Sequence, residues 1–173
     1  MNSPDKDIRF LKIISDHKKL IYKICYAYCK DPDDRKDLEQ EIIIQIWRSL
    51  DKYDEKFKLS TWLYRISLNT AISFYRKAAT EDKYREQYSK EIISLQEINP
   101  AENSSEKGNK DERIDFIYEF LEELDKVNKA LLLLYLDCNT YKEISLILGI
   151  SETNVATKIS RLKTKLREKF KNN

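Results

Sequence analysis

The 173-residue chain contains only two glycines and three prolines. Hairpins and β-sandwiches depend on these residues in their turns, because glycine accepts positive φ and proline fixes φ. So few of them exclude a fold with many short strands. The composition, 41% hydrophobic and 36% charged, is that of a globular chain. We therefore expect an all-α fold.

Cysteine and histidine are also scarce, with three and one in the chain. The odd number of cysteines (Cys25, Cys29 and Cys138) does not favour a disulfide framework. Cys25, Cys29 and His17 do not make up the four ligands that a closed zinc site needs. We expect no metal or cofactor, and we expect the cysteines to be small apolar core residues.

The same scarcity argues against an enzyme. A single histidine cannot be paired by sequence with a nucleophile, and no glycine-rich phosphate loop is present. The longest apolar run, Ala130–Leu136, is too short to cross a bilayer, and Met1–Asp7 has no signal core. We expect no catalytic residues, no membrane insertion and a cytoplasmic protein.

The strongest positive signal lies at Thr140–Leu166, which has the pattern of two helices joined by a tight turn. Thr140 and Glu143 have the spacing of a capping box, so a helix should begin at Tyr141. Gly149 can take the positive φ at which a helix ends. The first helix is therefore predicted to be about two turns long.

The second helix can be capped by Ser151, and apolar residues recur every three or four positions from Val155 to Leu166. Between Thr153 and Asn173 there are seven cations and one anion, although the whole chain carries only +2. This local excess favours phosphate contact over a merely solvated helix face, so we predict a DNA-binding helix-turn-helix. Its outward faces carry Asn154, Thr157, Lys158, Ser160, Arg161, Lys163 and Lys165.

A polar stretch at 78–111 divides the chain. Its centre, 99–110, has almost no side chain able to bury surface, a composition typical of disorder. We therefore expect a flexible linker between two small helical domains, 1–77 and 112–173. In the first domain, apolar periodicity predicts helices at about Phe10–Cys29, Asp34–Leu50 and Thr61–Lys77.

The third of these helices, capped by Ser60, has two usable faces. Its expected core face carries Leu63, Ile66, Thr70 and Phe74. A neighbouring stripe carries Trp62, Arg65, Asn69, Ser73 and Arg76. Rings mixed with cations suit single-stranded nucleic acid, since bases stack on rings and phosphates meet cations. Any single ring is more simply explained as core, so only the cluster indicates strand binding.

The two blocks together resemble a bacterial sigma factor of the extracytoplasmic-function (ECF) group. In the first block the resemblance rests on Asp37–Glu41, Trp47 and Thr61–Ile66, with Asn69, Ala71 and Arg76. In the second it rests on Thr140–Ile144, Leu148–Ser151 and Val155–Arg161. It covers about residues 10–77 and 112–169.

The resemblance implies that 1–77 is sigma region 2, which binds core RNA polymerase and opens the promoter at the minus-ten element. Residues 112–173 would be sigma region 4, which reads the minus-thirty-five element as duplex. The implied polymerase contacts are Asp37, Leu38, Gln40 and Glu41. The implied contacts with the unpaired minus-ten strand are Lys56, Lys58, Trp62, Arg65, Asn69 and Arg76. The implied minus-thirty-five contacts are Ser151, Glu152, Asn154, Thr157, Lys158, Arg161, Lys163 and Lys165.

The implied partners are core RNA polymerase, promoter DNA as duplex and as melted strand, and an anti-sigma factor, with the chain itself a monomer. The two promoter elements lie about 25 base pairs, or roughly 85 Å, apart. A flexible linker of about 36 residues spans only about 30 to 36 Å. We therefore expect polymerase to hold the two domains at promoter spacing, and the free chain to bind promoter duplex weakly.

Some positions depart from the family pattern. Ser73 stands where relatives often have Asp, and Arg35 and Lys36 replace a small and an acidic residue. Asp125 stands where Pro is frequent at a helix start, but Asp is itself a good N-cap.

Two other classes of protein remain open. A stand-alone helix-turn-helix regulator would explain the C-terminal element but not the stripe and acidic helix upstream, and it would not need to bind core polymerase. A helical adaptor that binds protein alone would not need the basic C-terminal helix.

Overall fold

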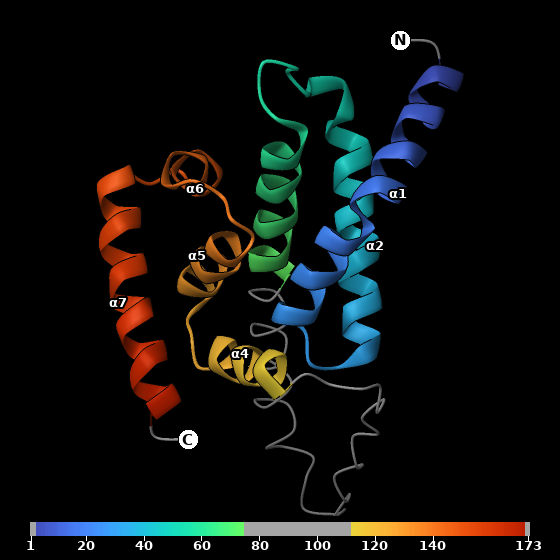
Figure 1. Ribbon diagram of the computed structural model, residues 1–173. Helices are drawn as coiled ribbons and strands as arrows, with labels where there is room; N and C mark the ends of the chain where they lie inside the picture. The colour runs from blue at the N-terminus through green and yellow to red at the C-terminus, as the bar shows by residue number, and fades with distance from the viewer. Residues whose placement is uncertain (1–2, 75–111, 172–173) are drawn as a thin grey trace, which may run out of the picture.

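The computed structural model describes residues 3–74 and 112–171, and within them every regular element is helical (Figure 1). The elements are α1 (Ser3–Tyr28), α2 (Pro32–Ser49), the 3₁₀ turn η1 (Leu50–Lys52), a helix over 59–74, α4 (Glu112–Glu122), α5 (Lys126–Leu136), α6 (Tyr141–Leu148) and α7 (Glu152–Lys171). The predicted all-α fold is confirmed. The linker expected at 78–111 and the site residue Arg76 lie outside the described residues.

Both N-terminal helices begin earlier than periodicity predicts. The Phe10 ring packs edge-on against Trp47 of α2, with 5.0 Å between centroids, and this contact supports the part of α1 that precedes Phe10. In α2 the carboxylate of Asp31 accepts hydrogen bonds from the backbone N–H groups of Asp33 and Asp34 at 2.8 and 3.2 Å. Pro32 follows at the first helical position, where its missing N–H is no loss.

The prediction that Ser60 caps the third helix is wrong. The carbonyl of Lys58 accepts the backbone N–H of Trp62 at 3.2 Å, so Ser60 already lies inside the first turn of the helix at 59–74. Its buried face is also broader than predicted. Leu63 is buried as expected, but the remaining buried residues are Thr61, Tyr64, Ser67, Leu68 and Ala71, whereas Ile66, Thr70 and Phe74 are only half-buried.

The predicted helix-turn-helix is present. Thr140 and Glu143 form the capping box of α6, and Gly149 ends this helix with φ 68°. The hydroxyl of Ser151 accepts the backbone N–H of Asn154 at 3.2 Å, which caps α7. The carboxylate of Asp125 caps α5 by accepting the backbone N–H groups of Val127 and Asn128 at 3.0 Å. All four local signals come from residues within three positions of the helix ends.

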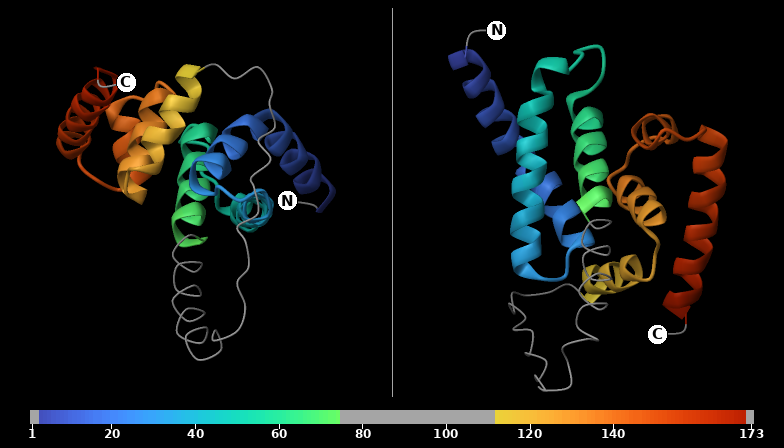
Figure 2. Two further views of the ribbon diagram at one scale, coloured as in Figure 1. Left: turned by 90° about the horizontal axis from the view of Figure 1, so that it is seen from below. Right: turned by 180° about the vertical axis from the view of Figure 1, so that it is seen from behind.

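The N-terminal unit (α1, α2 and the helix at 59–74) and the C-terminal unit (α4 to α7) share one hydrophobic core. The helix at 59–74, green in Figures 1 and 2, lies between α1 and α2 on one side and α5 on the other. Asp137, just after α5, pairs with Lys23 of α1 and accepts a hydrogen bond from the Tyr64 hydroxyl. The sequence predicted two domains, but not that they pack together.

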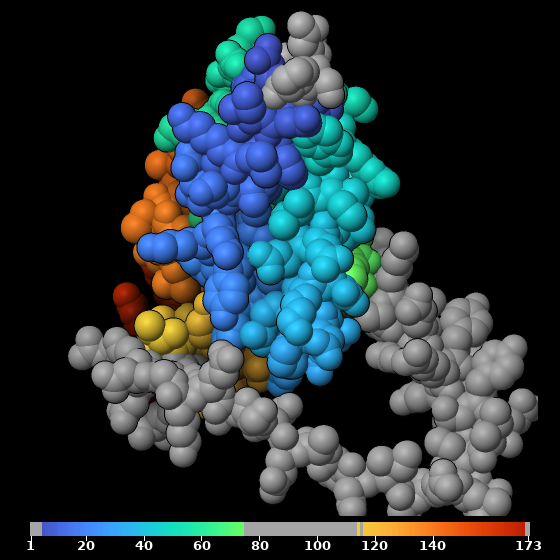
Figure 3. Space-filling view, turned by 90° about the vertical axis from the view of Figure 1, so that its right-hand side faces the viewer, coloured from blue at the N-terminus to red at the C-terminus, as the bar shows by residue number. Residues whose placement is uncertain are grey.

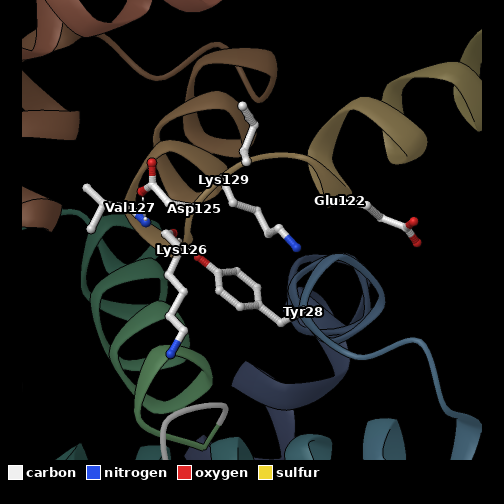
Figure 4. Close-up of a pocket in the computed structure, with 7 residues that line it drawn as sticks. Tyr28, Glu122, Asp125, Lys126, Val127 and Lys129 are labelled. Atoms are coloured by element: carbon white, nitrogen blue, oxygen red, sulfur yellow. Dashed lines mark hydrogen bonds between the residues drawn. The ribbon is translucent and has the colours of Figure 1, made fainter. Parts of the chain in front are cut away.

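A pocket of about 400 Å³ opens along this seam, between the end of α1 and the turn that precedes α5 (Figure 4). The Tyr28 hydroxyl donates to the carbonyl of Lys126 at 2.7 Å. The Lys129 amine donates to the carbonyl of Ala27 at 2.9 Å and lies 5.4 Å from the Tyr28 ring centre. These lining groups bind the protein itself, so the pocket is a gap in the packing between the two units.

Cys25 and Cys29 are free and buried, as predicted for core residues. Burial raises the pKa of their thiols to about 12 and about 11, which leaves them unreactive at neutral pH. Cys138 differs, since it is exposed. In the part of the chain that the structure describes, no metal-binding group of His, Cys, Asp or Glu occurs, and no helix combines the length and apolarity of a membrane span.

Cys138 follows α5 with φ 58°, a left-handed conformation that strains any residue with a Cβ. We expect Cys138→Gly to raise the free energy of unfolding by about 0.5 to 1 kcal/mol, measured by urea denaturation. Cys138→Ala is the matched control, because it removes the thiol and keeps the Cβ. Equal stability of the two variants would contradict the prediction.

Candidate polymerase and promoter interfaces

One face of α2 carries the predicted polymerase contacts. Asp37 and Gln40 are exposed, and Glu41 is half-buried and accepts a hydrogen bond from the Gln45 amide at 2.7 Å. Ile44 continues this face, one turn further on, and its side chain is 42% exposed. The face is therefore polar with one apolar residue in it, a mixture suited to protein contact.

The assignment of Leu38 as a polymerase contact is wrong. Its side chain is fully buried, as are those of Ile42 and Ile46. These residues recur every four positions, so they form the core side of α2. Leu38 lies inside the motif Asp37–Glu41 that carries the family resemblance, and the motif contains both the surface side and the core side of the helix. The spacing of the buried residues along α2 separates the core side from the surface side. The same spacing places Ile44 on the surface side.

The segment between η1 and the helix at 59–74 is a turn held by its own hydrogen bonds. The Tyr53 hydroxyl donates to the carbonyl of Phe57 at 2.7 Å, and the carboxylate of Asp54 accepts the backbone N–H of Lys56 at 3.0 Å. Lys56 and Lys58 are exposed, as predicted. The Phe57 ring is 52% exposed although it is apolar. The predicted contacts with the minus-ten strand do not include Phe57.

The predicted stripe on the helix at 59–74 is present as far as the structure describes it. Arg65, Asn69 and Ser73 are exposed. Trp62 is half-buried, and its ring centroid lies 4.9 Å from that of Tyr53. The Trp62 ring thus supports the turn, and the exposed ring beside the stripe is that of Phe57.

On α7 the predicted duplex contacts separate into two groups. Asn154, Lys158, Arg161 and Lys165 recur at intervals of four, three and four, which places them in one stripe flanking the buried Val155, Ile159 and Leu162. Ser151, Glu152 and Thr157 are exposed at the start of the helix.

Lys163 lies on the opposite flank of α7. Its amine is 4.4 Å from the centre of the Tyr135 ring on α5, and hydrogen bonding to the Tyr135 hydroxyl raises the pKa of Lys163. Two of the cations predicted to be equivalent, Lys158 and Lys163, thus have different surroundings.

An ion pair joins the turn before the helix at 59–74 to α6. The amine of Lys58 lies 2.6 Å from a carboxylate oxygen of Glu143, the capping residue of α6. The other carboxylate oxygen accepts the backbone N–H of Thr140 at 2.8 Å. These bonds, led by that from Lys58, lower the pKa of Glu143 to about 2.

These surfaces define a class of protein: an all-helical DNA-binding protein with a helix-turn-helix in its second half and a ring-and-cation surface in its first. Residues 13–81 match the family model described as sigma-70 region 2, and residues 117–166 match that of sigma-70, region 4. The chain belongs to the sigma-70 family of transcription initiation factors, in its ECF group. It binds core RNA polymerase and directs promoter-specific transcription initiation.

Two relatives come from Bacillus subtilis strain 168. The ECF RNA polymerase sigma factor SigW is 30% identical, over 94% of this chain and 89% of its own length. The RNA polymerase sigma factor SigV is 29% identical, over 86% and 82%.

Two solved structures share the fold at 20% identity. One is CnrH in complex with the cytosolic domain of CnrY, with a TM-score of 0.64 over 95% of this chain and 88% of that chain. The other is the sigma factor RpoE from Bartonella quintana in complex with the anti-sigma factor NepR, with a TM-score of 0.65 over 96% and 97%.

The lowered pKa of Glu143 predicts a pH dependence of stability. Because the ionised form is favoured in the folded chain, its contribution is complete above about pH 4.5 and is lost as the pH falls toward about 2. Over this window we expect Glu143→Gln to lose less unfolding free energy than the wild type, measured by urea denaturation at a series of pH values.

Glu119→Gln is the control for this series, because Glu119 is an exposed carboxylate on α4. It should follow the wild type. If Glu143→Gln also follows the wild type, the carboxylate of Glu143 does not stabilise the folded chain.

Proposed function

We propose that three surfaces of this sigma factor divide the work of initiation. The exposed face of α2, with Asp37, Gln40 and Glu41, binds the clamp of core polymerase. The turn with Lys56 and Lys58 and the exposed stripe at 59–74 hold the unpaired minus-ten strand. The stripe of α7 enters the major groove of the minus-thirty-five element.

The difference in chemistry between the two DNA surfaces carries this assignment. The turn has an exposed ring, Phe57, between two exposed lysines, which suits a splayed base flanked by phosphates. The α7 stripe has amide and cationic side chains at helical spacing and no exposed ring, which suits the base edges and phosphates of a duplex.

The packing of the two units bears on how these surfaces are used. Lys58 of the first and Glu143 of the second are in contact, whereas the two promoter elements lie roughly 85 Å apart. We infer that the two units separate when the chain binds core polymerase, which then holds them at promoter spacing.

An anti-sigma factor is a further proposed partner, supported by the RpoE–NepR complex that shares the fold. Since a sigma factor acts with polymerase on DNA, we place the chain in the cytoplasm. We assign it no catalytic step, because the polymerase performs the chemistry of initiation.

In vitro transcription with purified core polymerase and genomic DNA tests the proposal, since new start sites should share two spaced elements. On such a promoter Arg161→Ala should reduce transcription, because the loss of a base contact weakens promoter binding by about 1 to 3 kcal/mol. Lys163→Ala is the matched control and should have a smaller effect. If Arg161→Ala and Lys163→Ala reduced transcription equally, the α7 stripe would not be the surface that reads the minus-thirty-five element.

The polymerase surface is tested separately. Asp37→Ala combined with Gln40→Ala should weaken capture of core polymerase in a pull-down, because it removes two exposed polar contacts and leaves the core side of α2 intact. Asp16→Ala, at an exposed acidic position on α1, should leave capture unchanged. Full capture by the double variant would place the polymerase contact elsewhere. If the chain were a stand-alone regulator, the wild-type protein would also fail to capture core polymerase.

A further inference from the structure

The N-terminal half of α1 holds the turn that carries Lys56 and Phe57. Lys6 forms an ion pair with Asp51, and its amine lies 4.5 Å from the centre of the Trp47 ring. Arg9 donates to the carboxylate of Glu55 at 2.8 Å, and its guanidinium lies 5.7 Å from the centre of the Tyr53 ring. Figure 3 shows blue side chains of α1 against the teal side chains at the end of α2 and in the following turn.

These contacts matter because the turn is not basic by itself. Residues 51–58 contain three carboxylates, Asp51, Asp54 and Glu55, and three lysines. A DNA strand laid on such a turn would meet as many anions as cations. The structure gives each carboxylate a partner: Lys6 for Asp51, Arg9 for Glu55 and the backbone N–H of Lys56 for Asp54.

We propose that Arg9 and Lys6 are positioning residues for the minus-ten strand. They neutralise two carboxylates of the turn and hold it so that Lys56 and the exposed Phe57 face the strand. This inference rests on the proposed role of the turn in strand binding. It extends that function to α1, on which no DNA contact has been placed.

The exposure of the Arg9–Glu55 pair indicates that its main role is not to stabilise the fold. The two side chains are 38% and 75% exposed, and ion pairs so open to water contribute little to stability. Their effect on a nearby strand is different, because an unpaired Glu55 would repel the phosphates that Lys56 attracts.

A double-mutant cycle separates this role from direct contact of Arg9 with DNA. The variants are Arg9→Ala, Glu55→Gln and the combination, each assembled with core polymerase. The probe is a promoter fragment from the transcription assay in which the minus-ten strand is left single-stranded. Its dissociation constant is measured over a series of salt concentrations.

We expect Arg9→Ala to weaken binding about two- to fivefold in the wild-type background and to have a smaller effect in the Glu55→Gln background. Arg9→Lys should keep most of the affinity. Lys19→Ala, an exposed cation about 15 Å further along α1, is the control and should leave binding unchanged. The thermal midpoints and polymerase capture of all variants should match the wild type.

Two results would overturn the inference. Equal weakening by Arg9→Ala in both backgrounds would show that Arg9 contacts DNA itself, and no weakening in either would show that it has no part in binding. Lys56→Ala with Phe57→Ala tests the underlying proposal. If that pair of changes leaves binding intact, the turn does not hold the strand; if it weakens binding and the cycle shows no coupling, only the role of Arg9 fails.

Discussion

The relation between the two halves of the molecule depends on the carboxylate of Asp137. One oxygen pairs with Lys23 of α1 and the other accepts the hydroxyl hydrogen of Tyr64, and only 15% of the side chain is exposed. A carboxylate so shielded is stable only with such partners, so it ties the end of α5 to two helices of region 2 at once. Burial, helped by this bond, raises the pKa of Tyr64. A polar contact therefore helps to specify the packing of region 4 on region 2, beside the apolar core that the two share.

The two units can separate only if new contacts compensate for the free energy of the packing that is lost around Asp137. Around it lie buried apolar residues of both units, and the outer ion pairs, such as Lys30 with Glu122, are largely exposed. Exposed pairs add little, so the resistance to separation comes from the apolar core and from Asp137. A partner shifts the chain from the closed form, in which the units pack together, to the open form, in which they are apart. It can do so only by the difference between its binding free energies for the two forms. Core polymerase, with its proposed contacts on the exposed face of α2, meets this requirement only if it also binds region 4 away from region 2.

Sequence signals predicted the structure at four helix ends where the cause is local, although the predicted cap at Ser60 is absent. The capping box of Thr140 and Glu143, the left-handed Gly149 and the caps of Asp125 and Ser151 each act within a few residues, and each is present. The start of α1 and the burial of Tyr64 depend on Trp47 and Asp137, which lie far away in sequence, and no local pattern contains them. Leu38 shows a third kind of limit. A motif identified by resemblance includes both sides of a helix, and only the phase of burial shows which side a partner can reach.

Lys58 shows how the closed arrangement and strand binding oppose each other at a single atom. Its amine contacts Glu143 in the closed chain, and the same amine is proposed to meet a phosphate of the minus-ten strand. In the closed chain Glu143 takes one of the donors of this amine and neutralises its charge, and the strand would have to reach a turn that region 4 adjoins. Coupling of this kind is reciprocal. Whatever draws region 4 away frees Lys58 for the strand, and a strand bound at Lys58 weakens the hold on region 4.

The ion pair also neutralises the carboxylate that completes the capping box, so separation exposes an anion beside the helix-turn-helix at the moment when α7 has to meet phosphates. The carboxylate remains bound to the backbone N–H of Thr140, on α6 rather than on the α7 stripe, which keeps that charge off the duplex-facing side chains.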